Sequence, residues 1–147
     1  MKTSEVGIAL IKHYEGFRSK PYQDSAGFFT VGYGHLIGDG TSLPDNWNRP
    51  FSLGEINDLL KWDLVKFERG VSRYITVPIN QYQFDALVSF SFNLGLGTLQ
   101  RSTVRQKINR LDFKGAIQSL LRYDKAGSVA LKGLTLRRRA EAKLMTA

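Results

Sequence analysis

Hydrophobic residues recur with a helical spacing at the start of the chain and with a strand-like spacing after it. Residues 3–14 carry an apolar side chain at every fourth position, which predicts a short amphipathic helix that Gly16 ends. Residues 17–50 hold short aromatic and β-branched runs between Gly, Pro, Asp and Ser, and residues 28–33 are the best strand candidate. The apolar positions of the first helix are Val6, Leu10 and Tyr14.

From residue 52 onward the pattern is helical. Ser52 and Glu55 form a capping box that begins a long helix, predicted to reach residue 71. Asp63 falls on the apolar stripe of this helix and therefore points inward, where a carboxylate needs a partner. Further helices are predicted at about 80–94, 98–109, 112–123 and 134–145. The first of these is apolar around nearly its whole circumference, which is typical of a buried helix.

These elements predict an α+β fold in one domain, residues 1–147. A small N-terminal β lobe of about residues 17–50 precedes a larger C-terminal helical lobe of about 52–147, which also takes in the helix at 3–14. The long helix joins the two lobes. This β lobe holds too few strands to be stable alone, so we expect it to depend on the helices.

The amino-acid composition limits the kinds of catalytic site that the chain can hold. The 147 residues include no cysteine and only two histidines, so thiol catalysis and disulfides are excluded and a zinc hydrolase site is not expected. No apolar run approaches the ~20 residues of a membrane span. Charged residues interrupt the first fifteen positions, so we expect no cleavable secretion signal. The net charge of +8 favours polyanionic partners without choosing among them, and it also serves solubility.

Carboxylates remain as candidate catalytic groups, and two of them stand out. Glu15 lies at the end of the first helix, and Asp24 lies in the turn before the strand that holds Thr30. A pair of carboxylates across a cleft is what glycosidic hydrolysis requires, one as acid and one for the opposite face of the sugar. Taken singly, Asp24 fits an ordinary turn and Thr30 an ordinary strand residue. The hypothesis depends on the three together.

The run from Glu15 to Thr30, with Val31-Gly32-Tyr33-Gly34-His35 after it, resembles the phage-type lysozymes, endolysins of glycoside hydrolase family 24. The resemblance implies a lysozyme-like fold and a catalytic set of Glu15, Asp24 and Thr30. It also implies that His35 pairs with the acid on the long helix, here Asp63. Substrate contacts implied by the resemblance are Leu36, Phe92 and Ser102.

The arginines of the last predicted helix are interpreted from their spacing. Arg137 shares a face with Ala140 and Leu144, so it turns inward as structural support and can pair with Glu15. Arg138 and Arg139 are expected to be solvated. As a basic face they would concentrate the enzyme on anionic walls, and nucleic acid or membrane is the alternative for such a face.

The resemblance implies a muramidase that hydrolyses the β-1,4 bond between N-acetylmuramic acid and N-acetylglucosamine in peptidoglycan, with inversion, for lysis of a bacterial host. No cofactor is implied. We expect a monomer without nucleic-acid partner or stable membrane insertion, held in the host cytoplasm until it is released to the wall. The alternatives are a non-catalytic module that binds wall glycan and a lytic transglycosylase. An intact set of Glu15, Asp24 and Thr30 argues against the binding module, and Asp24 together with Thr30 argues against the transglycosylase.

Overall fold

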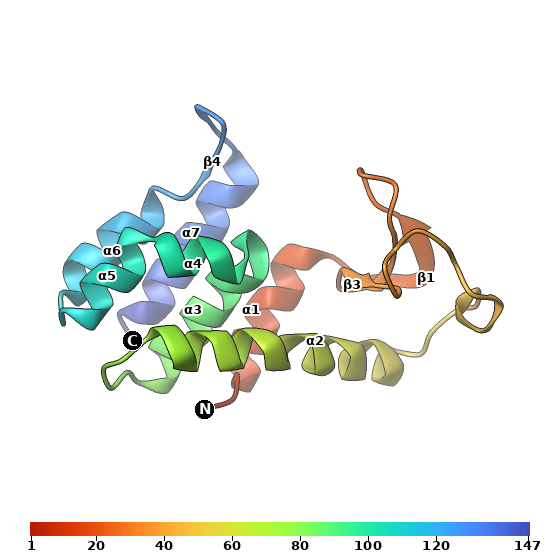
Figure 1. Cartoon of the computed structure of the whole chain (residues 1–147), viewed down its shortest axis with the longest axis horizontal. Coiled ribbons are helices and arrows are strands. Elements are labelled where there is room, and N and C mark those ends of the chain that lie inside the picture. Colours follow the sequence, from red (N-terminus) through yellow and green to blue (C-terminus); the bar gives the residue numbers. More distant parts are fainter. The chain divides into compact units, whose positions relative to one another are not determined.

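The computed structural model describes all residues, 1–147, and confirms the α+β class. The chain forms two compact units, residues 15–65 and residues 1–14 together with 66–147. Figure 1 shows the helices and strands, with colours that follow the sequence from the N-terminus to the C-terminus. The helices are α1 (Glu5–Glu15), α2 (Leu53–Tyr74), α3 (Gln81–Leu94), α4 (Leu96–Arg101), α5 (Thr103–Asn109), α6 (Phe113–Leu121) and α7 (Lys132–Met145), with a 3-10 turn η1 (Asp45–Trp47). The strands are β1 (Arg18–Gln23), β2 (Phe29–Gly32), β3 (His35–Leu36), β4 (Lys125–Ala126) and β5 (Val129–Ala130). None of the helices has both the length and the apolar character that crossing a bilayer demands.

The unit of residues 15–65 contains an antiparallel sheet in the order β1-β2-β3. The strand predicted at 28–33 is confirmed as β2, and the turn before it connects β1 to β2. Val31 lies in the small core of this unit together with Ile56, the first buried apolar residue of α2. A methyl group on Gly32 would lie 2.7 Å from Ile56 Cγ2, so the glycine allows the sheet to approach the helix closely.

Helix α2 begins at the predicted capping box and runs three residues past its predicted end, to Tyr74. The Ser52 amide donates to Glu55 Oε1 at 3.0 Å, and the Glu55 amide donates to Ser52 Oγ at 3.1 Å. Arg49 adds a second link, because its Nη2 donates to Glu55 Oε2 at 2.7 Å. The start of α2 is therefore held by a local network of three residues.

This network predicts an acid-dependent change in stability. The Arg49 guanidinium, and after it the Ser52 amide, lower the pKa of Glu55 from 4.5 to about 2. A carboxyl whose pKa is depressed by folding stabilises the fold above its ordinary pKa, and this contribution is lost as the pH falls toward the folded value. In Glu55→Gln we expect a deficit in the free energy of unfolding that is constant above about pH 5 and shrinks between pH 4.5 and about 2. Urea denaturation across this range measures it, and a deficit that does not change with pH would contradict the network.

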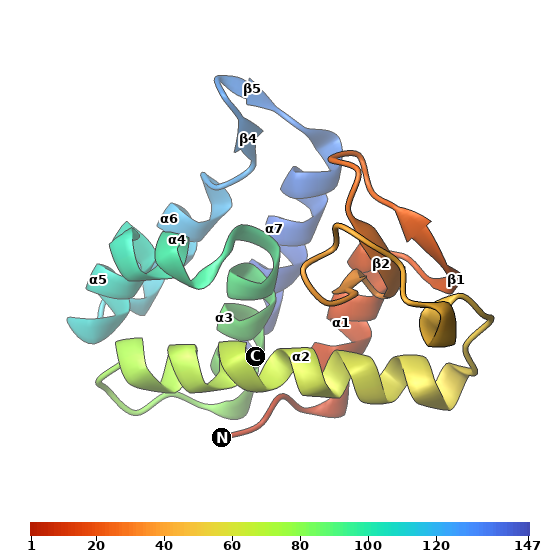
Figure 2. The ribbon, with the colours of Figure 1, turned by 45° about the vertical axis from the view of Figure 1, so that its right-hand side comes forward.

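The second unit is helical, and α3 lies at its centre (Figure 2). Residues 84–91 of α3 are all buried, as the apolar pattern predicted. Asn80 caps α3 by accepting the Gln83 amide at 2.8 Å, and the Gln83 side chain accepts from the Asn80 amide at 2.9 Å. Helix α7 packs along α3, and α6 packs against both α5 and α7. The helices predicted at 80–94, 112–123 and 134–145 correspond to α3, α6 and α7.

The single helix predicted over 98–109 is wrong, because the chain breaks at Ser102. This residue has extended backbone angles, φ −78° and ψ 152°, and its hydroxyl accepts the Arg105 amide at 3.0 Å. Ser102 thus ends α4 and caps α5. Serine side chains bond to backbone groups in this way at helix starts. The break was missed because the apolar residues keep their helical spacing on both sides of Ser102.

The first helix also turns a different face to the core than its spacing predicted. Gly7, Ile8 and Ile11 are buried, whereas Val6 is half exposed. The reason is Asp85 of α3, which is fully buried and accepts the Ser4 amide at 2.9 Å. A methyl group on Gly7 would lie 2.7 Å from the Asp85 carboxyl carbon, so α1 places its glycine against this carboxylate.

The arginines of α7 are partly as predicted. Arg137 is buried, as expected, and donates to the Ser89 carbonyl at 3.2 Å. Arg138 is also fully buried, so its predicted exposure is wrong, while Arg139 is exposed. The reason is Glu141, buried three residues further along α7, whose carboxylate lies 2.7 Å from Arg138 Nε. Asn93 accepts a further hydrogen bond from Arg138 Nη2 at 2.8 Å.

Candidate functional site

Glu15 is the last residue of α1, and Gly16 ends the helix in the left-handed conformation with φ 75°. The Glu15 side chain is partly buried. Its carboxylate lies beside the turn between β2 and β3, since a methyl group on Gly34 would lie 3.7 Å from Glu15 Oε1. The ring of Tyr33, in this turn, meets the ring of Phe17 edge to face at 5.6 Å. Glu15 is therefore placed by the end of a helix against a tight turn of the sheet.

Asp24 lies in the turn between β1 and β2, where the backbone orients its carboxylate. Oδ1 accepts the amides of Ala26 and Phe28, each at 2.9 Å. Oδ2 has no hydrogen bond within the protein, and the side chain is partly exposed. The turn interpretation of Asp24 is thus correct, and the same hydrogen bonds leave one carboxylate oxygen in a fixed position for another partner.

Thr30 follows in β2 and is buried, with 5% of its surface exposed. It is paired in the sheet with Tyr22, and its hydroxyl lies 3.4 Å from the Tyr22 carbonyl. The long distance marks a weak hydrogen bond, so the hydroxyl keeps capacity for a second partner. Glu15, Asp24 and Thr30 all belong to the compact unit of residues 15–65.

His35 and Asp63 form the pair that the resemblance implied, with Asp63 at the inward position that the helix periodicity predicted. His35 Nδ1 lies 2.9 Å from Asp63 Oδ2 and 3.0 Å from Oδ1. The His35 ring also stacks on Trp47, with ring centres 5.7 Å apart and planes at 15°. Because Asp63 belongs to α2 and His35 to β3, the pair ties the sheet to the helix.

Loss of this pair is expected to lower stability more than activity. In Asp63→Asn the imidazole keeps its stacking on Trp47 and loses its charged partner. Both side chains are mostly buried, with 15% and 23% exposed. A hydrogen bond to a charged group contributes about 1.5–3 kcal/mol, and we expect the free energy of unfolding to fall by about that amount. Urea denaturation measures this, with Asp58→Asn on the exposed face of α2 as the matched control.

Activity per folded molecule is expected to survive in Asp63→Asn. A variant that unfolds like the wild type and no longer cleaves substrate would instead make Asp63 a catalytic residue.

The predicted substrate contacts lie in different surroundings. Leu36 is exposed in β3, with 45% of its surface accessible, as a contact residue must be. Phe92 is partly buried in α3, with its ring edge to face with Phe67 at 5.2 Å. Ser102 is only 1% exposed, and its hydroxyl donates to the Leu99 carbonyl at 2.8 Å while it caps α5. The Ser102 side chain therefore has a helix-capping role and no surface for a sugar, which corrects that expectation.

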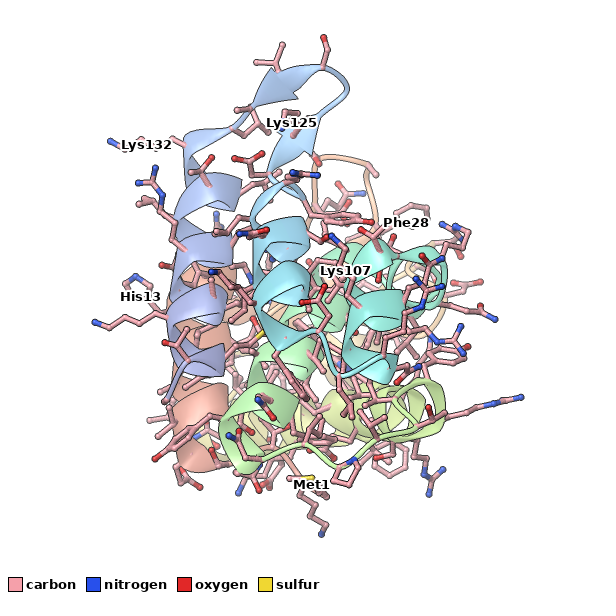
Figure 3. The ribbon with its side chains drawn as sticks, turned by 90° about the vertical axis from the view of Figure 1, so that its left-hand side faces the viewer. Met1, His13, Phe28, Lys107, Lys125 and Lys132 are labelled. Atoms are coloured by element: carbon pink, nitrogen blue, oxygen red, sulfur yellow. The ribbon has the colours of Figure 1, made fainter.

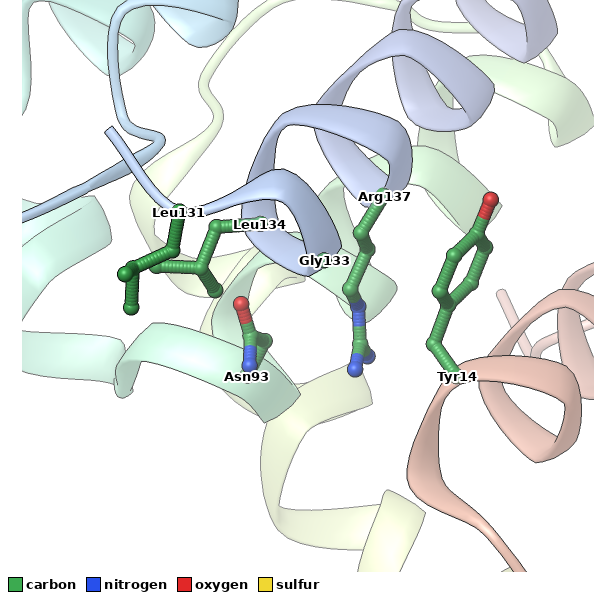
Figure 4. A pocket seen from close by; sticks show the side chains of 6 residues that line it. All are labelled: Tyr14, Asn93, Leu131, Gly133, Leu134 and Arg137. Atoms are coloured by element: carbon green, nitrogen blue, oxygen red, sulfur yellow. The ribbon is translucent and has the colours of Figure 1, made fainter.

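A pocket of about 340 Å³ opens in the helical unit beside the end of α1 (Figure 4). The Arg137 guanidinium points into it between the side chains of Asn93 and Tyr14. The Tyr14 hydroxyl donates to the Leu136 carbonyl at 3.2 Å, which holds this wall against α7. Sequence reasoning missed Asn93 and Tyr14, although each directly adjoins a predicted site residue, Phe92 and Glu15. The remaining lining residues are Leu131, Gly133 and Leu134.

Each of the three proposed catalytic residues is held by a helix, a turn or a strand, and each can serve a different chemical role. Glu15 can carry a proton at a helix end. Asp24 can accept one through a carboxylate held by two amides. Thr30, on β2, can orient a small hydroxylic partner through its side-chain hydroxyl.

Comparison with known proteins gives the family. The model of the phage lysozyme family matches residues 12–141. The endolysin of Salmonella phage P22 is 36% identical over 147 residues, which is 99% of each chain. The endolysin of Bacillus phage B103 is 38% identical over 146 residues, and this chain spans 54% of its length. The muramidase domain of SpmX from Asticaccaulis excentricus superposes with a TM-score of 0.89 at 30% identity, with 99% of this chain and 98% of that chain covered.

The match extends over most of the chain, and the fold agrees with that of the solved relatives. The chain therefore belongs to the phage lysozyme family.

Proposed function

We propose that Glu15, Asp24 and Thr30 are the residues with which this phage lysozyme hydrolyses the β-1,4 bond between N-acetylmuramic acid and N-acetylglucosamine. The chain is a peptidoglycan-degrading muramidase of host lysis, in keeping with its family and its endolysin relatives. The observation that carries the assignment of the residues is the anchored carboxylate of Asp24, which shares one compact unit with the helix-end carboxyl of Glu15.

In this mechanism the protonated Glu15 gives its proton to the glycosidic oxygen as the bond to the leaving sugar breaks. A water attacks the anomeric carbon from the opposite face, and the Asp24 carboxylate accepts its proton. The Thr30 hydroxyl accepts or donates a hydrogen bond to that water and so fixes its line of approach. Attack by water in a single displacement inverts the anomeric configuration.

The other assigned residues support this chemistry. His35 and Asp63 hold β3 against α2, and Arg137 keeps α7 attached to α3 through Ser89. Leu36 and Phe92 are the proposed apolar contacts to the glycan. Carboxylate chemistry of this kind needs no cofactor. We propose a monomer that reaches the wall after release from the host cytoplasm and does not take nucleic acid as a partner.

Purified peptidoglycan tests the proposal. The lysozyme reaction is expected to give new reducing ends, which can be labelled with borohydride. Products that end in anhydro-muramic acid would identify a lytic transglycosylase, and binding without any product would identify a glycan-binding module. Proton NMR of the first products then reports the anomer formed, and the α-anomer is expected for inversion.

A further inference from the structure

The last 27 residues of the chain, 121–147, contain seven basic residues and two acidic ones. Folding buries both acidic side chains, fully or mostly, and leaves most of the basic ones exposed. Glu141 is fully buried, and the Asp124 side chain is 14% exposed and accepts from the Thr135 hydroxyl at 2.8 Å. The two most buried cations, Arg137 and Arg138, lie with Glu141. The other five are exposed: Arg122, Lys125, Lys132, Arg139 and Lys143. The surface of this segment therefore presents cations without an exposed acid.

Three of these cations line up on α7. Lys132, Leu136, Arg139 and Lys143 are spaced by four, three and four residues and are all exposed, so they form one stripe, here named the α7 outer face. The stripe is roughly 16 Å long at 1.5 Å per residue. Figure 3 shows Lys132 on the same side of the helical unit as His13 of α1.

Apolar side chains are interleaved with the charges. Leu136 lies within the stripe and is 43% exposed. The hairpin of β4 and β5 projects beyond α6 and α7 next to the start of the stripe (Figures 2 and 3). Val129 on this hairpin is 62% exposed, and Leu131, which connects it to α7, is 45% exposed.

We propose that the α7 outer face and the β4–β5 hairpin form a docking surface for an anionic phospholipid bilayer. The cations match the negative surface of such a bilayer, and each contributes about 1 kcal/mol, which is about a 5-fold gain in binding. The exposed Val129, Leu131 and Leu136 enter the boundary between headgroups and acyl chains, as apolar residues of peripheral amphipathic helices do. A soluble polyanion gives these side chains nothing to contact, and a second copy of the chain would bring two faces of like charge together.

Sedimentation with lipid vesicles at about 0.1 M salt tests the charge component. Vesicles of phosphatidylglycerol and phosphatidylethanolamine are expected to bind the protein, and phosphatidylcholine vesicles are not. Lys132→Gln, Arg139→Gln and Lys143→Gln together should weaken binding by about 10²-fold. The matched control combines Lys61→Gln, Arg110→Gln and Lys114→Gln, which are also exposed and lower the net charge by the same three units. An equal loss in both triple variants would overturn the proposal in favour of net charge alone.

The apolar component has its own test. Val129→Ser with Leu136→Ser keeps every charge and should weaken vesicle binding while binding to polyaspartate stays unchanged. No effect on vesicles, or equal binding to neutral vesicles, would overturn the bilayer as partner. All substituted side chains are exposed, and melting curves verify the fold. Glu15→Gln should bind vesicles like the wild type, so a failure of the proposed catalytic role is distinguishable from a failure of this one.

Discussion

Glu15→Gln is expected to abolish nearly all lysis of bacterial walls while the protein stays folded. The substitution keeps the shape of the side chain at the end of α1 and removes the proton that the glycosidic oxygen must receive. General acid catalysis contributes about 10²–10⁴-fold, and we expect a loss in kcat of at least this size. Turbidity decay of a wall suspension measures the rate, with enzyme concentration corrected for the folded fraction.

Glu5→Gln provides the control for this variant. Glu5 lies in the first turn of the same helix and is exposed, so its loss changes net charge equally without touching the site. We expect its rate to stay within about 2-fold of the wild type, since exposed substitutions change stability by less than about 0.5 kcal/mol. A folded Glu15→Gln enzyme that lysed walls at the wild-type rate would remove Glu15 from the mechanism.

Local signals in the sequence were enough to locate much of this fold. The capping box at Ser52 marks a helix start with short-range hydrogen bonds, and the structure contains it. Asp63 was found because a carboxylate on an apolar stripe must have a partner, and the partner is His35. Each of these inferences depends on residues close in sequence, or on one periodic element.

The features that sequence could not give depend on residues far apart. The face that α1 buries is set by Asp85, 81 positions beyond Ser4, and nothing within the first helix records it. Similarly, the burial of Arg138 depends on Asn93, which is 45 positions before it in the chain. The spacing of apolar residues assigns an arginine to the surface, because it holds no information on whether a buried carboxylate will lie beside the guanidinium and make its burial tolerable.

In the candidate site, too, local features were predictable from the sequence and features that join distant segments were not. The order of Glu15, Asp24 and Thr30 identified the chemistry through resemblance, since each residue alone fits an ordinary structural role. The two amides that fix the Asp24 carboxylate follow from its turn, which the sequence predicted. The pocket beside Arg137 did not, because its walls come from α1, α3 and α7.

The second prediction with a large expected effect concerns the stability that depends on the buried charges of α7. Glu141 lies between two arginines, 2.7 Å from Arg138 Nε and 3.4 Å from Arg137 Nε, and its Oε2 accepts from the Ser89 hydroxyl at 2.5 Å. Burial raises the pKa of Glu141, and the charge of Arg138 acts against this rise. Burial likewise lowers the pKa of Arg138, against the attraction of Glu141. Each charge is therefore tolerable in the core only because the opposite charge lies beside it.

Glu141→Gln is accordingly expected to destabilise the protein by about 3–5 kcal/mol, the usual cost of removing one partner of a buried ion pair. Two buried guanidinium groups then face each other across a neutral amide, so the melting temperature should fall by roughly 10 °C for a chain of this length. Arg139→Gln, on the exposed side of the same helix, should change the free energy of unfolding by less than about 0.5 kcal/mol. Thermal and urea unfolding of the two variants measure the contrast. Similar small losses in both would mean that the core accommodates Arg137 and Arg138 without their carboxylate, for example by admitting water.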